Sequence, residues 1–475
     1  MARPSDEATL ESYRTALRYA LLALLLLSPL PFGSVQPWAV LALELYAAGL
    51  GLFAVLLLRR DPEALPRKAR RALVPAGILV AVGILQILPA PGGWTRLVAT
   101  PTAEARRQIA EVLPEVGFGL APQSLGPAAT TDALLRLVAY VLVGVATVVA
   151  IRRSDHLRQT AVVLVASGAF QAFYGSSEYL SGHQHIFGYA KKYYDDVATG
   201  TFINRNHFAE YLALTLPLAL GLALEGARRF SRGDWRQRLL GLIEPAGTMV
   251  VAGAIGAALI WTGVVLSYSR GGLAAALAAC AIVLLACGWR RKRAWLLAAA
   301  LALPTVLLLA RDVQAPGERF LAPEQELLRL GGRLPVWQAT LRMVPDFLPF
   351  GSGLGTFEGA FELYRPESVR STWEHTHNDW LQALVEGGPL VVAALVWLLW
   401  ILVRRASPDS PSRPPVLILC ACAAILAAAI HGFVDFGLRI PAIAVLVACL
   451  VGMVASERGI DDETTRPLLR FSPRS

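Results

Sequence analysis

The sequence predicts an all-α, polytopic integral membrane protein with about twelve transmembrane helices, and three observations support this fold class. Hydrophobic residues make up 55% of the 475 positions, whereas charged residues make up only 17%; soluble proteins contain about a quarter charged residues. The hydrophobic residues are concentrated in blocks of roughly 17 to 25, the length that a helix needs to cross the hydrocarbon core. Short clusters of arginine separate many of these blocks, which is typical of the connections in membrane proteins.

We expect a single membrane domain over residues 1–475. The formal charge of +9 lies mostly in these arginine clusters, so it does not indicate a nucleic-acid-binding protein. Glu7 and Glu11 precede the first block and no small-residue cleavage site follows it, which predicts a retained span rather than a signal peptide. The expected spans are 15–32, 36–58, 72–90, 132–151, 159–178, 207–227, 246–266, 271–288, 294–310, 384–403, 415–434 and 438–455.

The arginine clusters fall on alternate connections, which predicts the orientation. They are Arg59-Arg60 with Arg67 to Arg71, Arg152-Arg153, Arg228-Arg229 with Arg232 to Arg238, Arg290 to Arg293, and Arg404-Arg405. Because positively charged connections remain in the cytoplasm, we expect these segments and both termini to be cytoplasmic. The outer side then receives the connections 91–131, 179–206, 267–270 and 434–438. It also receives a large loop, residues 311–383, before the third-last span.

The large loop is predicted to be partly helical. Leucine and tryptophan recur at helical spacing over residues 323–344, as in an amphipathic helix lying on a membrane. A glycine-rich run, Gly351-x-Gly353-x-Gly355, follows it. No strand precedes this run, so it favours a structural turn over a nucleotide-binding motif.

Four polar clusters are expected on the outer side. They are Thr201 to His207 with Asn204, Arg205 and Asn206; Ser267 to Gly272 with Ser269 and Arg270; Gly331 to Arg333 with Trp337; and Glu374, His375, His377, Asn378 and Asp379. Guanidinium groups bind phosphate oxygens in pairs and stay charged. Several arginines near helix N-termini would therefore form a pyrophosphate site. Two structural interpretations stay open: an arginine at a span end also serves as a snorkelling anchor, and Gly271 and Gly272 fit a tight turn with positive φ.

The cluster before the tenth span is the most informative stretch of the chain. Thr376 followed by Asp379 fits a capping box, which predicts a helix that begins at His377 and continues through the apolar run from Trp380 to Val403. A titratable ring at a helix N-terminus, level with the membrane surface, is well placed to act on an anionic, lipid-borne substrate. His375 and His377 lack a third ligand at a fixed offset, so the pattern does not predict a metal site.

One further pair lies near the outer end of the eleventh span. His431 and Asp435 are four residues apart, on one face of the expected helix. Ionisable groups at membrane depth are usually paired or functional, so we include both among the candidate substrate-binding residues.

With these residues identified, the chain resembles the O-antigen ligase/polymerase superfamily of polytopic bacterial glycosyltransferases. The resemblance covers residues 201–452. It depends on Phe202 to Ala209, Ser267 to Gly272, the segment from Arg333 to Phe357, His377-Asn378 with Gly388, His431-x-x-x-Asp435, and Pro441.

The resemblance implies transfer of a glycan from undecaprenyl pyrophosphate to an acceptor hydroxyl at the periplasmic face of the inner membrane. It implies no metal and no other cofactor. The catalytic residues would be His377, which activates the acceptor, and Arg205, Arg270 and Arg333, which hold the pyrophosphate. The substrate-binding candidates are Asn204, Asn206, His207, Ser269, Trp337, Glu374, His375, Asn378, Asp379, His431 and Asp435. The acceptor would be lipid A core, another glycan or a protein.

The alternatives within and outside this superfamily remain open. The ligase pattern has a small or hydroxyl residue where Val391 stands, so ligase and polymerase are both possible. A pilin O-glycosyltransferase of the same superfamily would differ in its acceptor alone. A transporter of a solute such as inorganic carbon would place charges near the membrane midplane, whereas polar residues gather here on one side.

Overall fold

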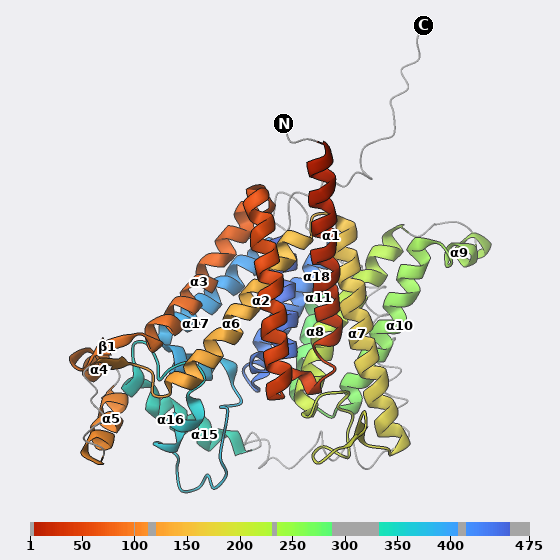
Figure 1. Ribbon diagram of the computed structural model, residues 1–475. Coiled ribbons are helices and arrows are strands. Elements are labelled where there is room, and N and C mark those ends of the chain that lie inside the picture. The colour runs from red at the N-terminus through yellow and green to blue at the C-terminus, as the bar shows by residue number, and fades with distance from the viewer. Residues whose placement is uncertain are drawn as a thin grey trace.

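The computed structural model describes residues 4–98, 100–112, 120–229, 235–286, 332–406 and 415–456, and it is a bundle of long helices (Figure 1). The elements in chain order are α1 (Pro4–Leu27), η1 (Phe32–Ser34), α2 (Pro37–Arg60), η2 (Pro62–Ala64), α3 (Arg67–Ile87), β1 (Pro89–Pro91), α4 (Gly92–Val98), α5 (Thr100–Val112), β2 (Leu120–Pro122), α6 (Pro127–Ala150), α7 (Ser154–Ser181), β3 (His185–Ile186), β4 (Tyr189–Ala190), α8 (Arg205–Arg229), α9 (Trp235–Gly241), α10 (Pro245–Leu266), α11 (Arg270–Ala286), α15 (Arg333–Met343), η4 (Val344–Phe347), α16 (Phe357–Glu362), α17 (Asp379–Ala406), α18 (Val416–His431), η5 (Gly437–Arg439) and α19 (Pro441–Ala455).

The predicted membrane-spanning, all-α class is confirmed by this arrangement. Within the described ranges, six helices are long and apolar enough to cross a membrane: α2, α3, α6, α8, α10 and α17. Three shorter apolar helices, α11, α18 and α19, accompany them. The strands form two small antiparallel pairs, β1 with β2 and β3 with β4.

Each expected span in the described ranges overlaps a helix. The ninth expected span, 294–310, lies outside the described residues, so the number of twelve stays a prediction. The same is true of the arginine cluster at 290–293 and of residues 311–331 of the large loop, including the first part of the expected amphipathic helix. The rest of that helix is present as α15.

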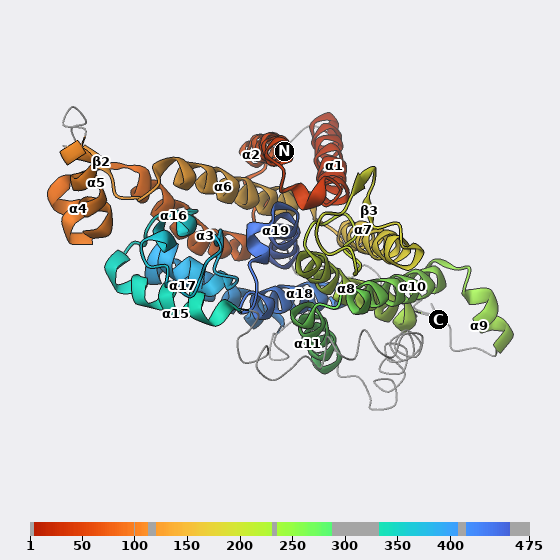
Figure 2. The same ribbon diagram turned by 90° about the horizontal axis from the view of Figure 1, so that it is seen from below.

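Helix α8 is the central helix of the bundle. In its most apolar stretch 89% of the residues are buried inside the protein, compared with 33% for α2, α3 and α17. It packs against α7, α10, α11 and α18 (Figure 2). A Cβ atom at Gly272 would collide with Ala209, so this glycine allows α11 to approach α8. The turn interpretation of Gly271 and Gly272 is therefore wrong: both are helical, and the positive φ of 50° belongs to Tyr268.

The arginine-rich connections meet at one end of the bundle. The Asp61 carboxylate, after α2, pairs with Arg14 of α1 and with Arg152, which lies 2.8 Å away between α6 and α7. Arg158 at the start of α7 pairs with Glu225 near the end of α8 at 2.9 Å. The arginine clusters within the described residues thus lie at a single end of the bundle, opposite α15 and α16 (Figure 1).

The glycine-rich run forms a structural turn at the other end. Gly351, Gly353 and Gly355 all have positive φ, at 83°, 118° and 74°. The Gln86 side chain of α3 donates hydrogen bonds to the Phe350 and Glu386 carbonyls at 2.6 and 2.7 Å. Through these hydrogen bonds the Gln86 amide of α3 connects the glycine-rich turn with α17.

Helix α17 is not one continuous helix, as the apolar run had suggested. Gly388 has φ 72° and ψ −179°, which interrupts the helical dihedrals, and Pro389 follows. A Cβ atom at Gly388 would collide with the Pro349 carbonyl. The glycine-rich turn packs into the interruption, and the short segment before it, Asp379–Gly387, is positioned separately from the rest of α17.

Candidate active site

Four helix N-termini meet at the connection between α18 and α19, residues 432–440. They are the first turns of α8, α11, α15 and α17. Ser269 Oγ, before α11, donates to Asn206 Oδ1 of α8 at 2.9 Å, and the Asp379 backbone N–H of α17 donates to the Gly432 carbonyl at 2.7 Å. Helix N-termini carry unpaired N–H groups and a partial positive charge. Their convergence favours an anionic ligand.

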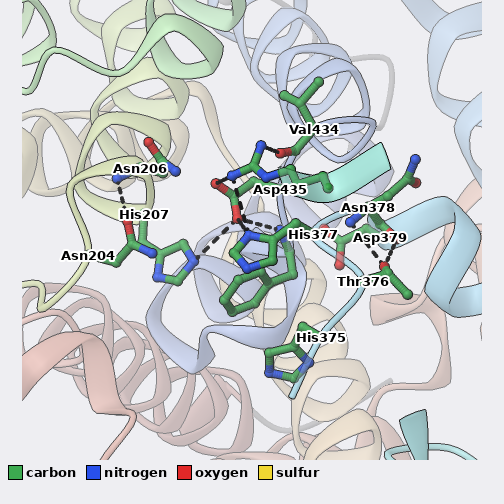
Figure 3. Close-up of polar contacts among 12 residues, drawn as sticks. Asn204, Asn206, His207, His375, Thr376, His377, Asn378, Asp379, Val434 and Asp435 are labelled. Carbon is green, nitrogen blue, oxygen red and sulfur yellow. Dashed lines mark hydrogen bonds and ion pairs between the residues drawn. The ribbon is translucent and has the colours of Figure 1, made fainter. Parts of the chain in front are cut away.

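His377 and Asp435 form the centre of this site (Figure 3). The Nδ1 atom of His377 lies 3.3 Å from Oδ1 of Asp435. A proton on Nδ1 donated to this carboxylate leaves the lone pair on Nε2, which is the arrangement of a base oriented by an acid. His377 has a positive φ of 52°, an uncommon value for a residue other than glycine. Tertiary contacts therefore hold this ring in place.

Arg333, the first residue of α15, binds to the same pair. Its guanidinium lies 3.5 Å from Oδ2 of Asp435 and 3.3 Å from Nδ1 of His377, and it donates to the Val434 carbonyl. Burial alone would raise the pKa of Asp435. The hydrogen bond from His377 and the nearby His207, His431 and Arg333 instead hold that pKa well below its ordinary value. Asp435 thus remains a carboxylate that fixes both the imidazole and the guanidinium.

Three imidazole rings surround one phenyl ring. The centroids of His207, His375 and His377 lie 4.7, 4.3 and 4.6 Å from that of Phe436. The buried His207 also places Nε2 3.8 Å from Oδ1 of Asp435, on the other side of this carboxylate from His377 (Figure 3). One histidine of α8 and two from the segment before α17 therefore all contact the connection 432–440.

A second polar chain runs beside the first. The Gln382 amide lies 3.1 Å from Nδ1 of His375 and donates to the buried Glu386 at 2.9 Å. Glu386 pairs with Arg439 of η5 at 2.8 Å. Burial would lower the pKa of Arg439, but the carboxylates of Glu386 and Asp379 raise it. Burial, with nearby Arg439, lowers the pKa of His375 to about 3, so this ring is neutral at physiological pH.

His431 and Asp435 are both paired, as expected for ionisable groups at membrane depth, and each has its own partners. The His431 Nδ1 atom lies 2.8 Å from Oε2 of Glu210 in α8, and both side chains are fully buried. Asp435 instead contacts Arg333 and His377. The Asp435 backbone N–H still donates to the His431 carbonyl at 3.1 Å, so the two residues stay adjacent while their side chains bind different partners.

The other expected arginines lie at the edges of the site. Arg205 begins α8, and its guanidinium lies over the ring of Tyr194, 5.6 Å from the centroid. Arg270 begins α11 and is exposed. Their sequence neighbours enter the site: Asn206 contacts Ser269, and a Cβ atom at Gly271 would lie 3.1 Å from His431 Nε2. Of the three arginines, Arg333 is the one that contacts the central pair directly.

Several expected substrate-binding residues serve as helix caps. The Asn204, Ser269 and Asn378 side-chain oxygens accept from the backbone N–H groups of Asn206, Gly272 and Leu381 at 2.8, 3.1 and 3.0 Å. These caps give the converging helices their starting points.

The predicted capping box at Thr376 is wrong in its register. Helix α17 begins at Asp379, and Asn378 is the capping residue. Thr376 Oγ1 accepts from the Asn378 N–H at 3.0 Å, and the Thr376 carbonyl accepts from Trp337 Nε1 of α15 at 2.8 Å. The carboxylate of Asp379 accepts from the Leu438 N–H at 3.1 Å. His377 therefore stands before the helix rather than at its first position.

Two cavities adjoin the site. An apolar groove of about 360 Å³ runs between α3, α6, α17, α18 and α19. Asp379 and Arg439 line one end of the groove, whereas Leu65 and Ala455 line the other. A smaller pocket of about 260 Å³ is lined by His377, Phe436 and residues 372–375, including Glu374.

Sequence reasoning missed Glu210, Glu386 and Arg439. Both glutamates have no exposed surface and lie close to apolar runs, where an ionisable residue is a functional candidate by default. That rule could have identified them. Among the described residues, no three histidine, cysteine, aspartate or glutamate side chains are grouped as metal ligands would be.

Comparison with known proteins identifies one region of similarity. Residues 255–396 match the family model described as O-antigen ligase. This region contains Arg270, Arg333 and His377, whereas His207 and Asp435 lie outside it. No curated protein matches the chain. The family match, together with the apolar helices, indicates a membrane protein that transfers glycans as a ligase or polymerase. The match over residues 255–396 thus supports the resemblance of this chain to the O-antigen ligase/polymerase superfamily.

Proposed function

We propose that this protein is a glycosyltransferase that moves a glycan from undecaprenyl pyrophosphate to an acceptor hydroxyl at the periplasmic face of the bacterial inner membrane. The observation that carries the proposal is the contact of His377, Asp435 and Arg333 where four helix N-termini converge. A base oriented by a carboxylate lies there beside a fixed cation, which suits a reaction that deprotonates one group and releases an anionic one.

The apolar groove supports a lipid-linked donor. It begins at Asp379 and Arg439, which lie next to the central site, and continues along α3 and α19 toward the opposite end of the bundle. Its lining is almost entirely apolar, so it can hold an isoprenoid chain while the pyrophosphate stays at the helix N-termini. Val391, the departure from the ligase pattern, lines this groove.

The proposed step is a single displacement at the anomeric carbon. The acceptor hydroxyl gives its proton to Nε2 of His377, and its oxygen forms the new bond to the anomeric carbon. The bond between that carbon and the phosphate oxygen breaks, and undecaprenyl pyrophosphate leaves with the electron pair. Arg333, with Arg205 and Arg270 at the rim, stabilises the growing negative charge. Attack opposite the leaving group inverts the anomeric centre.

The proposed orientation follows from the distribution of arginine. The described arginine clusters gather at the end of the bundle that is opposite the site. Because basic connections remain in the cytoplasm, we place that end and both termini in the cytoplasm. The site then faces the periplasm, where lipid-linked glycans, rather than nucleotide sugars, are the activated donors.

The test uses purified protein in proteoliposomes with a lipid-linked oligosaccharide as the donor. Lipid A core, a second repeat unit and a pilin protein are offered separately as acceptors. We expect release of undecaprenyl pyrophosphate with a glycosylated product, and the acceptor that reacts distinguishes ligase, polymerase and protein glycosyltransferase. His377→Ala and Arg333→Ala should abolish transfer.

Two exposed residues of the same types serve as control positions. Arg342 is exposed in the last turn of α15, and His183 is exposed in the loop after α7. Arg342→Ala and His183→Ala should retain activity. Full transfer by His377→Ala would contradict the proposal, as would uptake of a solute such as bicarbonate into the liposomes without any turnover of lipid-linked sugar.

A further inference from the structure

The smaller pocket has no role in the step proposed above. It has a volume of about 260 Å³ and is lined by Thr372, Trp373, Glu374, His375, His377 and Phe436. His377 lines it, but Asp435 and Arg333, which contact Nδ1 of His377, do not. One imidazole therefore borders two different environments: the charged centre and this pocket.

The charges in the pocket exclude the pyrophosphate. Its lining contains no lysine or arginine, and it contains the carboxylate of the exposed Glu374. A carboxylate repels a phosphate and accepts hydrogen bonds from hydroxyl groups. Burial lowers the pKa of His375 to about 3, so this ring adds a neutral polar group. The lining thus suits an uncharged ligand with many hydroxyls.

The two aromatic rings in the pocket lining, Trp373 and Phe436, indicate which class of uncharged ligand fits. Trp373 packs on one side against the small core formed by α15 and α16, and its ring lies edge-on to His377 at 5.3 Å between centroids. Phe436 is held by the three histidines around it. Rigid aromatic rings offer apolar contact at low entropic cost. The C–H face of a pyranose ring is the complementary surface, and the volume fits one ring rather than an extended chain.

We propose that this pocket binds the terminal sugar ring of a carbohydrate acceptor and directs one of its hydroxyls toward His377. The proposal rests on the glycosyltransferase function proposed above, and it names the acceptor class. Trp373 and Phe436 contact the ring, and Glu374 accepts from a hydroxyl that does not react. The reacting hydroxyl gives its proton to Nε2 of His377, while the donor stays on the side of Arg333. The acceptor is then a saccharide rather than a serine or threonine of a protein.

The kinetic test compares Trp373→Ala and Glu374→Gln with the wild type. We expect the KM for the saccharide acceptor to rise about tenfold or more in each variant, while the KM for the lipid-linked donor stays the same. Trp373→Phe should restore much of the acceptor affinity because it keeps an aromatic ring. Glu367→Gln is the matched control: this glutamate is exposed in the same loop but does not line the pocket. It should leave both KM values unchanged.

Two kinetic results would overturn the proposal. A rise in the donor KM would assign the pocket to the donor sugar, and unchanged KM values in both variants would show that no sugar is held there. Glu374→Gln keeps the shape of an exposed side chain, so it provides the answer if Trp373→Ala does not fold.

A binding measurement separates this proposal from the function itself. Saturation-transfer NMR with methyl glycosides of the acceptor sugar needs no donor and no turnover. We expect a signal with the wild type and with Glu367→Gln, and its loss with Trp373→Ala. Binding of the glycoside without any transfer activity would refute only the proposed function. Binding that survives both Trp373→Ala and Glu374→Gln would refute only the acceptor pocket.

Discussion

His377 and Asp435 are 58 positions apart in the chain, yet the Nδ1 atom of one lies 3.3 Å from a carboxylate oxygen of the other. The contact joins the segment before α17 to the connection between α18 and α19. Arg333 reaches both residues from α15. An imidazole, a carboxylate and a guanidinium from three different elements therefore meet at one place.

Asp435→Asn should lower the turnover number for glycan transfer by about 100-fold. The amide removes the negative charge that fixes the Nδ1 proton of His377 and pairs with Arg333. The KM for the acceptor should change little, because Asp435 does not line the acceptor pocket. Steady-state kinetics in proteoliposomes check this. Asp346→Asn, on an exposed aspartate that accepts from Tyr364, should keep its turnover number; an unaffected Asp435→Asn would show that the dyad has no catalytic role.

Glu386→Gln should destabilise the protein by about 3 kcal/mol, because it leaves the guanidinium of Arg439 without its buried partner. Thermal unfolding in detergent measures the effect as a lower Tm. Combining the change with Arg439→Gln should recover part of the loss, since no unpaired charge then remains. The comparison is Glu358→Gln, on an exposed glutamate in α16, which should be neutral. Equal stability of Glu386→Gln and the wild type would mean that the pair contributes nothing.

Gly353→Ala should lower the Tm, whereas Gly359→Ala should not. Gly353 has φ 118°, and a Cβ atom there would collide with Ser124 Oγ, so strain and overpacking together should cost about 2 kcal/mol or more. Gly359 lies in α16 with no atom within 4 Å of its added Cβ. Alanine should stabilise that helix slightly. Thermal unfolding of the two variants side by side measures this difference. Equal Tm values would show that the turn at Gly353 has no structural role.

Between pH 7 and pH 4 the stability of the protein should fall partly because of His375. Burial lowers the pKa of this imidazole to about 3, while its unfolded form titrates near its ordinary value of about 6.5. As the pH falls through that range, the unfolded state takes a proton that the folded state does not, which favours unfolding. His375→Gln should reduce the fall in Tm over this range. His183→Gln, at an exposed position, should not reduce it; an identical pH dependence for His375→Gln and the wild type would disprove the assignment.

Local sequence patterns predicted the helices and the segments that form the site. Apolar blocks of membrane-spanning length appear as helices, and the polar clusters around Asn206, Ser269, Arg333 and His377 meet at one end of the bundle. Hydropathy and charge are properties of short windows, which is why these predictions were possible. The start of α17 was misplaced by two residues because Asn378, rather than Thr376, satisfies the first free N–H groups.

The partners of the buried charges could not be predicted in this way. His431 pairs with Glu210 and Glu386 pairs with Arg439 through contacts between distant segments. The packing of α8 against α18 forms the first pair, and the packing of α17 against η5 forms the second. No spacing rule within one helix describes such contacts. His431 and Asp435 are both paired, as ionisable groups at membrane depth are expected to be, but their partners lie on other elements and could not be named from spacing.

The interruption of α17 at Gly388 has a mechanical consequence. The part of α17 after Gly388 crosses the hydrocarbon and can tilt to match a thicker or thinner bilayer. Because the helical dihedrals are interrupted at Gly388, this tilt need not rotate the first turn of the helix at Asp379. That turn is fastened instead to Gly432 and Leu438. The end of α17 beside His377 can thus keep these hydrogen bonds while the rest of the helix tilts.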